Sequence, residues 1–181
     1  MLLWLIGLAI IIVLVFILYY NRFVTLGNRI DNSLSQIDVQ LRKRADLVPN
    51  LMNSVKGYVK HERGVMKEVT DARKAFMGAK TMEQKVEKGA ELQNALKSIL
   101  AIAENYPQLR ASENFLQLQQ ELSAIEDKVA YARQHYNDSI LSYNNLCKKF
   151  PGVAFASLYG KSSKKYLEIP QEARSVPKVE F

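Results

Sequence analysis

The chain has 181 residues, and 25 basic against 18 acidic side chains give a formal net charge of +7. That length fits one domain with an appendage, and the scarcity of glycine (8) and proline (5) argues against a sandwich or barrel with many tight turns. A single cysteine excludes an internal disulfide and a cysteine-rich zinc site. Two histidines, far apart in sequence, argue against a multi-histidine metal centre.

The first 21 residues carry no charged side chain. Leu2 to Tyr20 form an apolar run that spans roughly 28 Å as a helix, close to the roughly 30 Å of bilayer hydrocarbon. Trp4 lies near one end and Tyr19 near the other, where aromatic belts are expected. The basic region and small-residue cleavage site of a secretory signal do not occur. We therefore predict a transmembrane anchor over residues 1–21, with a fully buried core helix as the alternative.

Basic side chains follow this segment and none precedes it. Arg22 and Arg29 come soon after the apolar run, and Arg42-Lys43-Arg44 lies further on. The positive-inside rule then predicts a single-pass protein of the cell (inner) membrane, with the amino terminus outside and the bundle in the cytoplasm. Because the bias rests on few charges, the opposite orientation stays open.

Residues 24–78 have helical periodicity, with two apolar lines in seven-residue steps that are offset by four residues. The lines are Ile30, Ile37, Arg44, Leu51, Tyr58 and Val65, and Leu34, Leu41, Val48, Val55, Glu62 and Val69. Since the register continues across Pro49, we predict one kinked helix running on from the membrane span. The alternative is a turn near residues 44–49. A kink would leave the carboxyl-terminal tail far from the membrane, whereas a turn would return Lys161, Lys164 and Lys165 to the bilayer.

Two further helices are predicted after Gly78. Thr81 and Gln84 fit a capping box at the start of a helix that stops at Pro107. Residues 112–150 contain sustained heptads and predict a long helix that Pro151-Gly152 ends. The heptad positions are Phe115, Leu122, Val129, Tyr136, Tyr143 and Phe150, and Leu118, Ile125, Ala132, Ser139 and Leu146.

The predicted fold class is all-α, an amino-terminal transmembrane helix followed by an antiparallel up-and-down helical bundle with long kinked helices. The predicted parts are the anchor (1–21), the bundle (22–150) and a tail (151–181) of a short helix and an extended strap. This tail either remains free of the bundle or packs on it through apolar side chains. Those side chains are Phe155, Leu158, Tyr159, Tyr166 and Phe181.

Three blocks of sequence resemble the LemA family of bacterial membrane proteins, and together they cover nearly the whole chain. The first block comprises NRID (28–31), SQIDVQLRKR (35–44), DLVPNL (46–51), VKGY (55–58) and His61-Glu62. The second comprises LRASENF (109–115), Leu118-Gln119, Glu121-Leu122, Ile125-Glu126, YARQHYND (131–138) and Tyr143-Asn144. The third comprises Phe150-Pro151 and VPKVEF (176–181). The resemblance implies one membrane helix followed by an antiparallel bundle, and it implies no known catalytic activity.

Catalytic and metal-binding motifs are absent from the sequence. It contains no nucleophile elbow, phosphate-binding loop or dinucleotide fingerprint. His61-Glu62 would need a second histidine at position 65, which is Val65. His135 and Cys147 lie about 18 Å apart on one helix, too far for direct proton transfer. We predict no catalytic, cofactor-binding or metal-binding residues, and Cys147 as a small buried hydrophobe.

Polar residues at heptad spacing suggest helix pairing. Asn137 and Asn144, like Glu126 and Arg133, lie seven residues apart. They provide either a surface for a partner or, as we favour, hydrogen bonds between helices that set the register of the bundle. Asn50 is similarly expected to cap a backbone carbonyl that Pro49 frees.

The basic excess favours lipid over nucleic acid, because basic residues are dispersed among acidic ones. Arg22 is the best candidate for a headgroup contact, since Arg42-Lys43-Arg44 lies about 30 Å further along a straight helix.

We predict a non-catalytic, membrane-anchored scaffold or interaction platform, with the lipid bilayer and a protein partner or a homo-oligomer as its contacts. Self-association is suggested because the helix over residues 112–150 would be about 58 Å long and the one over residues 82–105 only about 36 Å. The alternative is an accessory or regulatory subunit of a membrane enzyme such as a protease or cell-envelope enzyme.

Overall fold

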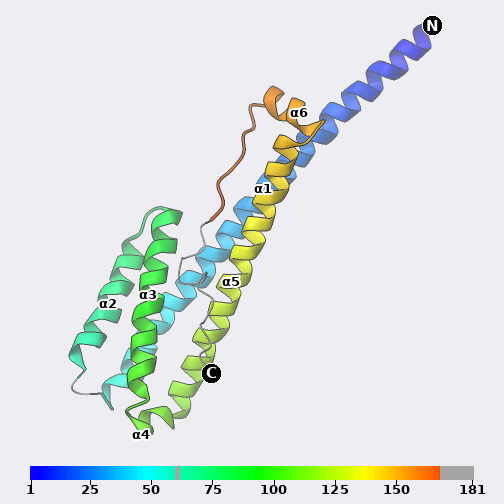
Figure 1. Ribbon diagram of the computed structural model, residues 1–181. Helices are drawn as coiled ribbons and strands as arrows, with labels where there is room; N and C mark the ends of the chain where they lie inside the picture. The colour runs from blue at the N-terminus through cyan, green and yellow to red at the C-terminus, as the bar shows by residue number, and fades with distance from the viewer. Residues whose placement is uncertain (60–61, 168–181) are drawn as a thin grey trace, which may run out of the picture. The chain divides into compact units, whose positions relative to one another are not determined.

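The computed structural model describes residues 1–59 and 62–167, which form six helices and no strand (Figure 1). The helices are α1 (Leu2–Lys56), α2 (Arg63–Gly78), α3 (Met82–Ala103), α4 (Pro107–Arg110), α5 (Glu113–Lys148) and α6 (Gly152–Leu158). The chain divides into two compact units. Unit 1 comprises Met1–Ser33 and Arg133–Phe181, and unit 2 comprises Leu34–Ala132. The predicted all-α fold with a long apolar first helix is confirmed for these residues.

The first helix continues through Pro49, which confirms a continuous helix there and excludes a turn near residues 44–49. The prediction that this helix reaches Gly78 was wrong, because α1 stops at Lys56 and α2 begins at Arg63. Val55 is buried and Tyr58, the next predicted heptad position, is 42% exposed, whereas Val69, further along the same pattern, is buried in α2. The heptad spacing therefore continues on a separate helix. Gly57 lies in the turn, as expected of the residue type that helices disfavour.

Unit 2 is a four-helix bundle built from α2, α3 and the parts of α1 and α5 that belong to it. Asp38 of α1 pairs with Lys85 of α3, and Arg44 lies opposite Gly89 and Gln93, so α1 and α3 run parallel. Since α2 connects them through two turns, α2 runs antiparallel to both. The predicted up-and-down order is confirmed within this unit. Its fully buried core includes side chains from all four helices: Ile37, Leu41, Leu51, Val69, Phe76, Leu92 and Phe115.

The start of α3 follows the predicted capping box. The Gln84 backbone N–H donates to Thr81 Oγ1 at 3.2 Å, and the Thr81 N–H donates to Gln84 Oε1 at 3.3 Å. Two of the free N–H groups at the helix start are thereby satisfied by side chains.

The heptad positions of α5 are buried along nearly the whole helix, from Phe115 (2% exposed) to Tyr143 (5%). The exception is Phe150, which lies beyond the end of α5 and is 87% exposed. We expected the apolar heptad positions of α5 to extend beyond the helices that cover them, and this was wrong. The helix α1 is far longer than the helix over residues 82–105 and covers the heptad positions that the shorter helix does not reach.

Unit 1 pairs α1 and α5 in opposite directions. Residues later in α1 contact residues earlier in α5. The rings of Phe23 and Tyr143 have centroids 5.8 Å apart, and the Ser33 side chain contacts His135. A cluster of Phe23, Leu26 and Ile30 with Ile140, Tyr143, Cys147 and Ala156 forms the core. The carboxyl-terminal end of α5 consequently lies beside the end of the apolar segment of α1. The prediction that a continuous α1 leaves the tail distant was wrong, because the turn after Lys56 adds one more helix.

Candidate functional site

The short helix α6 packs against the last turns of the apolar segment of α1 (Figure 1). Phe155 stacks on Tyr19, with ring centroids 4.3 Å apart, and meets Phe16 edge-on at 5.1 Å. The Tyr159 hydroxyl donates to the backbone oxygen of Phe16 at 2.8 Å. This aromatic contact fixes α6 beside the predicted membrane boundary. It confirms that the tail packs through Phe155 and Tyr159.

Two other predicted packing residues of the tail point outward. Leu158 is 62% exposed and Tyr166 is 48% exposed, so they do not pack on the helices as expected. Phe181 lies outside the described residues. Within residues 149–160, the large apolar side chains that are exposed are Phe150, Val153 and Leu158.

A left-handed glycine ends α6 and redirects the chain. Gly160 has φ of 62°. The N–H of Lys161 donates to the oxygen of Ala156 at 2.8 Å, and the N–H of Gly160 donates to the oxygen of Ser157 at 3.3 Å. These two bonds form a Schellman motif, in which glycine avoids the steric cost of a positive φ. The chain then continues as the strap, residues 161–167.

Two asparagines on α5 hold the strap. The Asn144 side chain accepts from the N–H of Lys164 at 2.8 Å and donates to its carbonyl oxygen at 2.9 Å. Asn137 makes the same pair of bonds with Leu167, at 3.1 and 3.3 Å. Seven helical residues rise about 10 Å, and three extended residues cover about the same length, so the spacings match. The favoured prediction of bonds between helices was wrong for these two asparagines, and the predicted extended strap is confirmed over residues 161–167.

Seven exposed basic side chains gather in the part of unit 1 that adjoins the apolar segment, and we call them the basic cluster. They are Arg22, Arg29, Lys148, Lys149, Lys161, Lys164 and Lys165. Residues 1–30 and 139–167 contain no aspartate or glutamate. Positive charge is therefore unbalanced in this part of the chain, whereas the chain as a whole mixes both signs.

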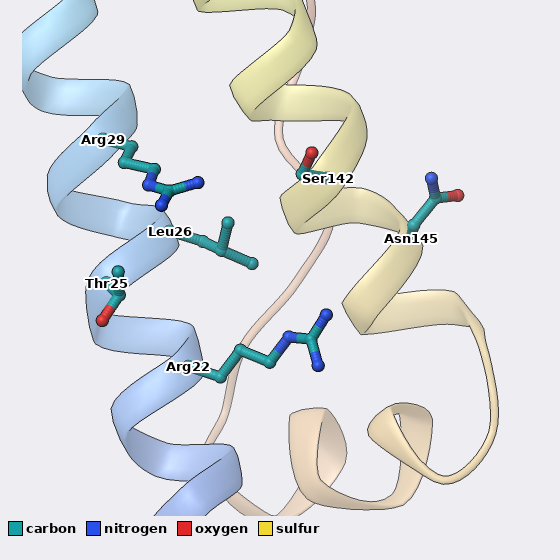
Figure 2. Close-up of a pocket in the computed structure, with 6 residues that line it drawn as sticks. All are labelled: Arg22, Thr25, Leu26, Arg29, Ser142 and Asn145. Atoms are coloured by element: carbon teal, nitrogen blue, oxygen red, sulfur yellow. The ribbon is translucent and has the colours of Figure 1, made fainter.

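A polar cavity of about 440 Å³ lies between α1 and α5 in unit 1 (Figure 2). Its lining is formed by Arg22, Thr25, Leu26, Arg29, Ser142 and Asn145. Figure 2 shows both guanidinium groups extending from α1 toward α5, one on each side of Leu26. The lining offers two cations, two hydroxyls and an amide, and it contains no carboxylate from residues 1–59 or 62–167.

His135, which the sequence analysis considered as a catalytic base, contacts the buried Ser33 of α1. Ser33 is buried, and its hydroxyl donates to the Arg29 carbonyl oxygen at 2.8 Å. Its other contact, at 2.8 Å, is with His135 Nδ1, which must then be the donor. A histidine that donates to a hydroxyl does not activate it as a base. His61 lies outside the described residues.

Burial affects the titration of several groups in unit 1. Burial raises the pKa of the Cys147 thiol, and the neighbouring charge of Lys148 opposes this effect. Burial also raises the pKa of the Tyr143 phenol. The predicted buried position of Cys147 is confirmed, and such a thiol is a weak nucleophile at neutral pH. Among the described residues no group of three histidine, cysteine, aspartate or glutamate side chains could hold a metal ion.

A buried arginine connects three helices of unit 2. Arg44 is 3% exposed, and its Nη1 donates to the Gly89 oxygen at 3.4 Å and to Gln93 Oε1 at 3.2 Å. Gln93 in turn donates to Glu126 of α5. Glu126 therefore pairs between helices as predicted, and Arg44 is an internal group that does not reach a lipid surface.

The backbone carbonyl that Pro49 leaves without its helical hydrogen bond has a donor that the sequence did not predict. Pro49 has no N–H, so the oxygen of Ala45 loses its helical partner. Arg73 of α2 supplies one, because its Nε donates to this oxygen at 2.8 Å. The sequence assigned this role to Asn50, whereas the structure gives it to a residue of another helix.

Loss of Arg73 is expected to cost stability only while Pro49 is present. Arg73→Met should lower the free energy of unfolding by about 1–2 kcal/mol in the wild type, because a buried carbonyl is left without a donor. In a Pro49→Ala background the alanine N–H restores the helical bond, and the cost of Arg73→Met should fall below about 0.5 kcal/mol. Thermal and urea unfolding of the four proteins measures this coupling. Equal costs in both backgrounds would show that Arg73 acts in some other way, and exposed Lys74→Met is the control.

Comparison with known proteins places these features in a family. A family model described as the LemA family matches residues 33–181. The magnetosome protein MamQ of Magnetospirillum gryphiswaldense is 24% identical over 167 residues, which cover 78% of this chain and 61% of that protein. The protein LemA of Metamycoplasma hominis is 28% identical over 131 residues, which cover 69% of this chain and 58% of that protein. The chain thus spans about three fifths of the length of these relatives.

Proposed function

The chain belongs to the LemA family, and we propose that it is a non-catalytic, membrane-anchored scaffold that presents a helical surface to a protein partner. The apolar segment of α1 and this membership indicate a single-pass membrane protein. We further propose that the amino terminus lies outside and the bundle in the cytoplasm, because basic residues follow the span and none precedes it.

The observation that carries this proposal is the use of reactive side chains for structure. The Ser33 hydroxyl is committed to a backbone oxygen, and the Cys147 thiol is buried. Asn137 and Asn144 hold the strap, and Arg73 satisfies a helix carbonyl. Side chains engaged in this way order helices and leave little for chemistry on a substrate.

The surface that we assign to a partner lies in unit 2, at the edge of the heptad positions of α5. A groove of about 330 Å³ is lined by Gln36, Gln40, Asp127, Lys128, Tyr131 and Ala132. Tyr131 is 69% exposed beside it, and Gln40 Oε1 is buried without a hydrogen-bond partner among the described residues. An exposed tyrosine beside polar groups in a concave surface is typical of protein interfaces.

Site-specific crosslinking in cells tests this proposal. A photoreactive phenylalanine at Tyr131 should capture one partner at near-stoichiometric yield, which is purified in mild detergent and identified by mass spectrometry. The same residue at exposed Lys97 of α3 is the control and should capture less. A partner with a cytoplasmic domain supports the orientation, whereas a partner confined to the outside contradicts it. A protein that stays monomeric and uncrosslinked at both positions would refute the scaffold.

The identity of the captured protein separates two versions of the proposal. Crosslinks only to a second copy of the chain would support a homo-oligomeric scaffold. Crosslinks to one membrane protease or cell-envelope enzyme would support an accessory or regulatory subunit of that enzyme.

A further inference from the structure

The cavity lined by Arg22 and Arg29 begins directly after the apolar segment that is long enough to cross a bilayer. Arg22 is the second residue after the apolar run ends at Tyr20. Arg29 follows about 10 Å further along the helix. A headgroup layer is roughly 5–7 Å thick on each side of the hydrocarbon, and arginine side chains extend several ångströms, so both guanidinium groups can reach it.

The packing of α6 supports this depth independently. Phe155 and Tyr159 contact Phe16, Tyr19 and Tyr20, the residues at the end of the apolar segment. Aromatic side chains collect at the level of the headgroups. The exposed Phe150 precedes α6 and the exposed Leu158 is its last residue, and an interfacial position gives such apolar groups an apolar surrounding.

The charges of the cavity select an anion. Within residues 1–59 and 62–167, neither Arg22 nor Arg29 has a carboxylate within salt-bridge distance. Guanidinium groups bind phosphate oxygens through paired N–H donors. Thr25, Ser142 and Asn145 can bond to hydroxyl groups of the same ligand. A zwitterionic headgroup gains less, because the described part of the lining has no carboxylate for its ammonium group.

We propose that this cavity binds the phosphate group of an anionic phospholipid through Arg22 and Arg29. The lipid chains lie along the apolar segment of α1, and the rest of the headgroup contacts the hydroxyl and amide side chains of the lining. Such a site holds the protein at a defined depth in anionic membranes. It does not depend on which protein partner the scaffold recruits.

Native mass spectrometry of the full-length protein in detergent, with added dioleoyl phosphatidylglycerol or dioleoyl phosphatidylcholine, tests this site. The wild type should retain one phosphatidylglycerol with at least about tenfold preference over phosphatidylcholine. Arg22→Gln/Arg29→Gln should lower that occupancy about tenfold or more. Arg22→Lys/Arg29→Lys should give an intermediate loss, because the charge remains but the paired donors do not.

Lys148→Gln/Lys149→Gln is the matched control. It removes the same charge from exposed members of the basic cluster that do not line the cavity, so lipid retention should change less than about threefold. Equal losses in both double variants would mean general attraction and overturn the site, as would full retention by Arg22→Gln/Arg29→Gln. Displacement of the lipid by millimolar inorganic phosphate would overturn the lipid assignment in favour of a soluble phosphate. Circular dichroism checks that each variant keeps its helices.

Discussion

Arg44→Ala is expected to lower the free energy of unfolding by about 3 kcal/mol, the largest loss that we predict for one polar side chain. Arg44 is 3% exposed and donates to the Gly89 oxygen and to Gln93. Its removal takes away these two hydrogen bonds and opens a cavity among three helices of unit 2. Thermal and urea unfolding in detergent, followed by circular dichroism, measures the loss.

Two companion variants separate the causes. Arg42→Ala removes an exposed arginine two residues away, whose partner is Asp38 in an exposed i,i+4 pair, and it should cost less than about 0.5 kcal/mol. Arg44→Met keeps most of the volume and removes the donors, so its cost should lie between those of the two alanine variants. If Arg44→Ala matched Arg42→Ala, the buried arginine would not be a significant source of stability.

Gly152→Ala is expected to lower the free energy of unfolding by about 2 kcal/mol and to loosen α6 from α1. A Cβ at this position would lie 2.2 Å from the backbone oxygen of Leu146 and 3.1 Å from its Cδ1. Because the closest atom belongs to the backbone, the turn between α5 and α6 must shift. That shift moves Phe155 and Tyr159 away from the apolar segment.

Thiol labelling reports this displacement directly. Cys147 shares a buried cluster with Ala156 of α6, and burial raises the pKa of its thiol. Wild-type protein should therefore react slowly with iodoacetamide near neutral pH, and its rate should rise as the pH approaches the raised pKa. In Gly152→Ala the thiol is more exposed, its pKa falls toward the ordinary value, and labelling accelerates several-fold.

Gly27→Ala is the control for Gly152→Ala, because the same substitution is expected to stabilise the protein at this position. Gly27 lies inside α1, and no atom lies within 4 Å of a Cβ built there. Alanine should stabilise the helix by about 0.5–1 kcal/mol and leave the labelling rate of Cys147 unchanged. A slowly labelled, fully stable Gly152→Ala protein would contradict the prediction and show that the turn absorbs the extra carbon without displacing α6.

The two predictions concern different parts of the molecule. Arg44 lies in unit 2, where the polar network connects helices of the bundle. Gly152 lies in unit 1, where α6 contacts the apolar segment and the basic cluster follows. Measured together, they test whether the partner-binding bundle and the membrane-adjacent end lose stability separately. A Gly152 variant that impairs lipid retention while sparing crosslinking at Tyr131 would support that separation.

Local features of this protein could be predicted from sequence alone. The apolar run, the Thr81–Gln84 capping box and the heptads of α5 each depend on neighbours within a turn or two of helix. Continuity through Pro49 was also predicted correctly, since the apolar register on both sides belongs to one face. The end of α1 was misplaced because the heptad spacing persists by chance past Gly57, and the turn depends on packing that periodicity does not report.

Only the tertiary structure decided which groups meet across the chain. Arg73 reaches the carbonyl freed by Pro49 from another helix, and no local pattern links these two residues. The spacing of Asn137 and Asn144 predicted hydrogen bonds to a neighbouring helix, but both side chains bond to the extended strap. The strap reaches them only because the chain reverses at Gly160. The convergence of Arg22 and Arg29 with Ser142 and Asn145 likewise requires α5 to return antiparallel to α1. Sequence determines the elements because their forces are local, whereas the contacts that make a site depend on where the turns send each helix.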